Sequence, residues 1–190
     1  MRRLKYLIRP NIFPHFLVDE INHLNDLLGL ETNLSDSYVF DVILNKEKLK
    51  IPYRTYVNLP TEELFQSLST RQQQVVSCLL TRHHNGFVRE QHLKRIILIQ
   101  EPWAVPFISQ LIGEYVVEIL FEISDNLVHL DINEFNKFFN DNREFFIRTK
   151  QRVRSYWNCY YKNEYKEFEE YIGNRVITYF EGYSGRGNYT

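Results

Sequence analysis

Cysteine is nearly absent from this 190-residue chain: only Cys78 and Cys159 occur, and they form no C-x-x-C pair. This scarcity excludes a disulfide framework and a cysteine-based zinc site. No G-x-S-x-G, P-loop, dinucleotide-binding glycine motif or His-Glu-x-x-His occurs either. The sequence therefore predicts no cofactor and no metal site, and it favours a non-enzyme.

The sequence also lacks the signals of a leader peptide and of a membrane-spanning helix. The basic start Met1–Lys5 is not followed by an apolar run, so it does not resemble a signal peptide. The most apolar stretch, 103–123, is long enough to cross a bilayer, but it carries three glutamates that would be costly at membrane depth. We expect a cytoplasmic protein without a membrane segment.

The residues that are present predict a folded, mainly α protein. Hydrophobic residues make up 44% and aromatic residues 15% of the chain, which suffices for a packed core. The pattern favours a multi-helix single domain over 1–181, with one small β-hairpin at about 37–56 and a flexible tail at 182–190. The expected helices are 13–30, one opened by a capping box at Ser69 and ending at Asn85-Gly86, 88–99, 103–123, and long C-terminal helices broken near Asp131 and Asp141.

Charge is distributed unevenly along the chain. No Lys or Arg occurs between Ile96 and Asn136, whereas that segment holds seven acidic residues. At helical spacing, four of them form one acidic stripe on the expected helix: Glu114, Glu118, Glu122 and Asp125. Two interpretations stay open: the stripe reaches solvent or pairs with arginines such as Arg89 or Arg152, or it binds a protein partner. In either case we expect Glu118 to have solvent or a cation beside it, because an unpaired buried carboxylate is costly.

The following segment, 137–162, is basic and interleaves cations with aromatic residues, a composition typical of nucleic-acid binding. Its candidate basic face consists of Arg148, Arg152 and Arg154. On a helical wheel, Val153, Tyr156, Trp157 and Tyr160 share one face and are expected in the core, which leaves Arg148, Arg152 and Ser155 as an ordinary solvated face. We favour the solvated helix face over nucleic-acid binding.

Three histidines, His83, His84 and His92, lie close together in the sequence. Adjacent histidines on a helix point in different directions, so a shared metal ion is not expected. An enzyme with an unrecognised His/Glu site stays open as an alternative.

Two segments resemble known helical families. Val88-Arg89, followed by Glu101-Pro102-Trp103-Ala104-Val105-Pro106 and the apolar residues up to position 124, resembles one HEAT-type repeat over 88–124. That resemblance implies an α-helical scaffold that binds macromolecules. Leu68-Ser69-x-Arg71-Gln72-x-x-Val75 resembles the opening of a LuxR-type helix-turn-helix, although the third helix is too apolar to read bases.

Together these patterns favour a non-catalytic protein–protein interaction module, acting as a regulatory, assembly or toxin-neutralising partner. The alternatives are a nucleic-acid-associated protein that uses 137–162 and the enzyme with a His/Glu site.

Overall fold

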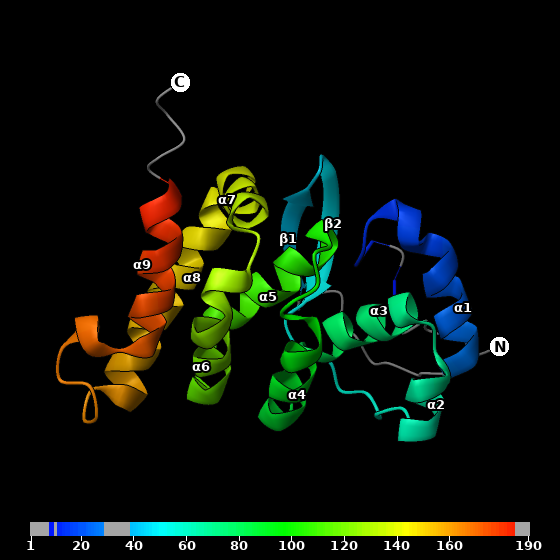
Figure 1. The fold of residues 1–190 in the computed structure, drawn as a ribbon, viewed down its shortest axis with the longest axis horizontal. Coiled ribbons are helices and arrows are strands. Elements are labelled where there is room, and N and C mark those ends of the chain that lie inside the picture. The colour runs from blue at the N-terminus through cyan, green and yellow to red at the C-terminus, as the bar shows by residue number, and fades with distance from the viewer. Residues whose placement is uncertain (1–7, 10, 29–38, 185–190) are drawn as a thin grey trace. The chain divides into compact units, whose positions relative to one another are not determined.

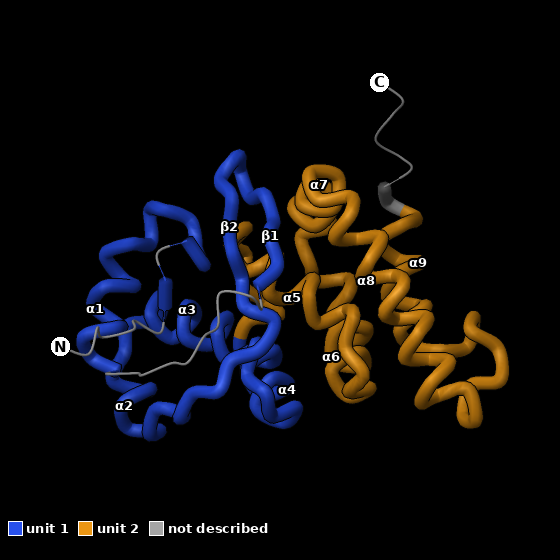
Figure 2. Tube along the Cα trace, turned by 180° about the vertical axis from the view of Figure 1, so that it is seen from behind, with its two compact units in different colours: residues 1–95 blue, residues 96–190 orange. Residues whose placement is uncertain are grey.

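The computed structural model describes residues 8–9, 11–28 and 39–184, and the chain divides into two compact units, 1–95 and 96–190 (Figure 2). Each unit is described by itself below. The architecture is mainly α with one antiparallel hairpin, which confirms the expected fold class (Figure 1). Within the described residues, no helix is long and apolar enough to cross a membrane.

The first unit combines the hairpin with several short helices. The 3-10 turn η1 and α1 replace the expected helix over 13–30, whose last two residues lie outside the described ranges. Helix α1 packs on α3 and buries Ile21 and Leu24. The elements are η1 (His15–Leu17), α1 (Val18–Leu28), β1 (Val39–Leu44), β2 (Glu47–Pro52), α2 (Glu62–Ser67), α3 (Thr70–Leu80) and α4 (Gly86–Ile96).

The hairpin follows the alternation of the sequence. Strand β1 buries every second residue, and Leu44 pairs with Glu47, so only Asn45 and Lys46 form the turn. Both turn residues have positive φ, 49° and 71°, as in the tight turns whose twist matches paired strands. The strands end at Pro52, short of the expected limit at about 56, and residues 37–38 lie outside the described ranges.

Helix α3 begins with the predicted capping box. The Ser69 side chain accepts from the backbone of Gln72, and the Gln72 side chain accepts from the backbone of Ser69. The helix ends at Leu80 and not at Asn85-Gly86, because the chain leaves it to pair with an extended segment. Thr55 N–H donates to the Arg82 carbonyl at 2.8 Å, and His84 N–H donates to the Thr55 carbonyl at 2.9 Å.

The second unit is built from helices only, within the described residues. Its elements are η2 (Pro102–Ala104), α5 (Val105–Ile112), α6 (Val117–Asn126), η3 (Leu127–His129), α7 (Ile132–Asp141), α8 (Arg143–Tyr156), the π turn η4 (Trp157–Tyr161), η5 (Phe168–Glu170) and α9 (Ile172–Ser184). Helix α5 packs against α6, α7, α8 and α9, and all of its residues are buried. This central position explains why its sequence is apolar apart from Ser109 and Gln110.

The expected single helix over 103–123 is wrong. Helix α5 ends at Ile112, Gly113 caps it, and α6 begins at Val117 after a short connection. A glycine next to a helix end favours termination, but the apolar period continues through this break and conceals it in the sequence.

The breaks in the C-terminal half lie close to those predicted. The Asp131 side chain accepts from the backbone of Asn133 and Glu134 and caps α7. The second cap position is Asn142, whereas Asp141 is the last residue of α7. Helix α9 continues to Ser184, so the tail predicted from 182 begins inside a helix, and its last six residues lie outside the described ranges.

Candidate functional site

The four acidic candidates do not form one stripe, because the break at Gly113 separates Glu114 from the others. Glu118 and Asp125 are exposed and Glu122 is half-buried on α6, where their spacing places them on one face. The expectation that Glu118 reaches solvent is confirmed. Phe121 lies on the same face and is 41% exposed.

Glu114, by contrast, is only 2% exposed and lies in the connection between α5 and α6. The guanidinium of Arg152 lies directly against the preceding residue: a Cβ on Gly113 would be 2.6 Å from its Nε. Arg152 also donates to the side chains of Gln110 and Thr149, each at 3.1 Å. A buried carboxylate and a cation therefore share this region of the core, and Glu114 is not available to a partner.

The three basic candidates are also divided. Arg148 and Arg154 are exposed, but Arg152 points inward and is not part of a solvated face. The Arg154 guanidinium carbon lies 4.4 Å from the centre of the Phe168 ring. Arg148 and Arg154 are six residues apart on α8, so they do not present one continuous basic face.

Three tyrosines cluster beside α6, and one of them, Tyr160, was expected in the core but is exposed. The Tyr115 ring is 5.9 Å from Tyr156 and 6.3 Å from Tyr160 between centroids, and Tyr156 and Tyr160 are 6.1 Å apart. Tyr115 is 45% and Tyr160 64% exposed. Val153 and Trp157 are buried as expected, whereas Tyr160 is not.

The π turn η4 explains the error for Tyr160. A π turn contains an extra residue, so side chains beyond Trp157 fall behind the α-helical phase on which the helical wheel depends. The Trp157 indole N–H donates to the Tyr165 carbonyl at 2.9 Å and fixes the end of this turn. The density of aromatic residues between 156 and 161 is visible in the sequence. The sequence does not show where the π turn begins, and so it does not show which of these side chains face solvent.

Tyr161 joins the π turn to α6. Its hydroxyl donates to the Tyr115 carbonyl at 2.5 Å, just before α6 begins. Burial raises the pKa of Tyr161, and the nearby Glu118 carboxylate raises it further. The exposed residues of α6 and the neighbouring tyrosines are called here the tyrosine-acid surface, which consists of exposed Tyr115, Glu118, Phe121, Asp125 and Tyr160 and half-buried Tyr156.

The histidines of the first unit have structural partners. The His83 ring lies 3.1 Å from the Val57 carbonyl, and His83 Nδ1 accepts from the Asn85 N–H. Arg89 Nη1 donates to the carbonyls of His83 and His84. The His84 ring stacks on Tyr56 at 5.0 Å. These contacts hold the connection between α3 and α4 and suggest no shared chemistry.

His92 is the buried member of the group. Its Nδ1 lies 3.2 Å from the Ser77 hydroxyl, and the Phe65 ring meets it edge-on. Burial lowers the pKa of His92 to about 4, and the nearby charge of Arg95 lowers it in the same direction. The ring is therefore neutral at physiological pH.

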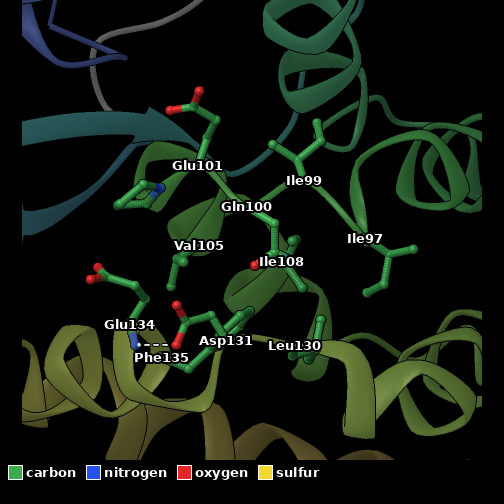
Figure 3. Close-up of a pocket in the computed structure, with 11 residues that line it drawn as sticks. Ile97, Ile99, Gln100, Glu101, Val105, Ile108, Leu130, Asp131, Glu134 and Phe135 are labelled. Carbon is green, nitrogen blue, oxygen red and sulfur yellow. Dashed lines mark hydrogen bonds between the residues drawn. The ribbon is translucent and has the colours of Figure 1, made fainter.

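A recess beside α5 and α7 in the second unit gathers three carboxylates, those of Glu101, Asp131 and Glu134 (Figure 3). Its volume of about 10 Å³ is room for about one water molecule. Asp131 points to the backbone N–H of Glu134, and Glu101 accepts from the Trp103 indole. In the described part of the chain, no group of three His, Cys, Asp or Glu side chains is arranged to hold a metal ion.

Comparisons with known proteins identify no relative: no family model, no curated protein and no solved structure matches the chain significantly.

Proposed function

We propose that this chain is a non-catalytic protein–protein interaction module, and that its second unit binds a basic, arginine-presenting protein segment through the tyrosine-acid surface. The observation that carries this proposal is the cluster of contacting rings of Tyr115, Tyr156 and Tyr160 next to α6, whose exposed Glu118 carboxylate lies close enough to Tyr161 to raise the pKa of that residue. Tyrosine is enriched in binding sites because it supplies a large, rigid contact area with a polar end.

The charge of α6 favours a basic occupant. Helix α6 contains Glu118, Glu122 and Asp125 but no Lys or Arg. Arginine matches both kinds of group, because its guanidinium pairs with carboxylates and stacks on aromatic faces. Nucleic acid is disfavoured at this surface, since phosphates would approach carboxylates.

The rigidity of the surface also supports the proposal. Tyr161 ties the π turn to the start of α6, and the tyrosine rings contact one another. Side chains that are already ordered lose less conformational entropy when a partner binds.

The test is a selection of random twelve-residue peptides displayed on phage against the full chain. We expect enrichment of arginine, and at least tenfold weaker binding of the selected peptides to a Glu118→Lys/Asp125→Lys variant. The matched control is Glu144→Lys/Glu169→Lys, which reverses two exposed acids of the same unit outside this surface and should bind as the wild type does.

Two results would overturn the proposal. One is a set of peptides without excess basic residues, or with equal affinity for the reversed variant. The other is tight, salt-sensitive binding of single-stranded DNA or RNA that Arg148→Glu/Arg154→Glu removes, which would make nucleic-acid binding the function.

A further inference from the structure

A second site lies in the first unit, where α2, α3 and α4 enclose a cavity of about 220 Å³. Five of its six lining residues carry polar side chains: the lining consists of Phe65, Thr70, Gln73, Gln74, Ser77 and Arg95. We propose that this cavity binds a small hydroxylated organic anion, with Arg95 pairing the carboxylate or phosphate group.

Arg95 supplies the only charge among the lining residues. Its guanidinium carbon lies 4.4 Å from the centre of the Phe65 ring, and this stacking restricts the orientation of the group. The nearest atom of Glu62 is 3.8 Å from Arg95 Nη2, which is longer than a charge-assisted hydrogen bond, and Glu62 is mostly exposed. The Glu62 carboxylate therefore neutralises Arg95 only weakly.

The floor of the cavity is polar but uncharged. Ser77 is 1% exposed, and its hydroxyl contacts the neutral His92 ring. Because the imidazole of His92 is unprotonated at physiological pH, this ring does not place a second cation beneath the floor.

The remaining lining groups favour a ligand with hydroxyl groups. Gln73 donates its amide N–H to the Leu68 carbonyl at 3.0 Å, which orients the amide and leaves its oxygen as an acceptor. Thr70 and Gln74 offer both donors and acceptors. The volume is far above that of one water but below the 300–1,000 Å³ of drug-sized sites, so the ligand is a small one.

Calorimetric titration and thermal melting of the full chain test this site with four probes: glycolate, L-malate, inorganic phosphate and glycerol 3-phosphate. We expect saturable binding of at least one probe at millimolar concentration, with a rise in Tm, because a ligand that binds only the folded state stabilises it. A carboxylate or a phosphate preference identifies the anionic group. Uncharged malamide should not bind.

Substitutions distinguish specific binding in this cavity from a general attraction of anions to surface cations. Arg95→Gln should weaken binding at least tenfold, and so should Gln74→Glu, which adds a repelling carboxylate without removing the stacking of Arg95 on Phe65. The matched control, Arg71→Gln, removes an exposed arginine of α3 that does not line the cavity and should bind normally.

The proposal is overturned if none of the four probes binds saturably, or if Arg71→Gln weakens binding as much as the cavity variants do. Should Arg95→Gln fail to fold, Gln74→Glu decides the question: unchanged affinity in that variant also overturns the proposal. None of these outcomes depends on the peptide-binding surface of the second unit.

Discussion

The Tyr171 hydroxyl gives a prediction with an unusual sign. Tyr171 is 0% exposed and its hydroxyl has no hydrogen-bond partner among the residues that the structure describes, although the ring stacks on Tyr161 at 5.4 Å and meets Tyr165 at 5.6 Å. Burial raises the pKa of Tyr171 well above its ordinary value, so the group stays neutral. Burying a hydroxyl without a partner costs about 1–3 kcal/mol.

Tyr171→Phe removes this hydroxyl and keeps the ring. After subtraction of the small contact energy of one oxygen atom, we expect the free energy of unfolding to rise by about 1 kcal/mol. For a chain of this size that corresponds to about 2–4 °C in Tm. Where a buried tyrosine hydroxyl does have a hydrogen-bond partner, the same substitution lowers the free energy of unfolding.

Tyr161→Phe is the matched control, because its hydroxyl donates to the Tyr115 carbonyl. We expect this second variant to lose about 1 kcal/mol. Urea unfolding followed by the fluorescence of Trp103 and Trp157, which both lie in the same unit, measures both variants. Equal destabilisation by the two substitutions would refute the reasoning, since it would mean that the Tyr171 hydroxyl forms a stabilising hydrogen bond.

Three further predictions concern the fold. The folded-state pKa of His92, about 4, lies below its unfolded value of 6.5, so the folded form binds fewer protons between these values and stability should fall as pH drops from about 6.5 to 4; unfolding of His92→Gln at several pH values should show a shallower loss. Ser69→Ala removes the capping box of α3 and should cost about 1 kcal/mol in urea unfolding. Gly173→Ala would place a Cβ 2.6 Å from the Tyr171 ring and 2.8 Å from Val153, so overpacking of about 1–3 kcal/mol should outweigh the gain in helix propensity and lower the Tm.

The elements that could be predicted are those with local signals. Alternating apolar residues marked the hairpin, and Ser69 and Asp131 marked two helix starts through their side-chain caps. The break at Gly113 was missed because apolar residues continue on both sides of it, α5 being buried all round.

The candidate site could be predicted only in part. The acids of α6 were found from their spacing, but the inward position of Arg152 depends on the close approach to Gly113, a contact between distant residues. The exposed position of Tyr160 was missed because the helical wheel assumes an unbroken α-helix, and the π turn changes the phase. The cavity beside Arg95 needs three helices to form it, so no single segment of sequence indicates it.

The π turn also has an evolutionary consequence. It is equivalent to inserting one residue into a continuous α-helix, a change of a single codon. Such an insertion leaves the preceding turns of α8, with buried Phe146, Thr149 and Val153, undisturbed, while it changes the direction of the side chains inside the turn, such as that of Tyr160. A lineage could thus gain or lose the exposed position of Tyr160 in one genetic step, without redesigning the core on which the helix rests.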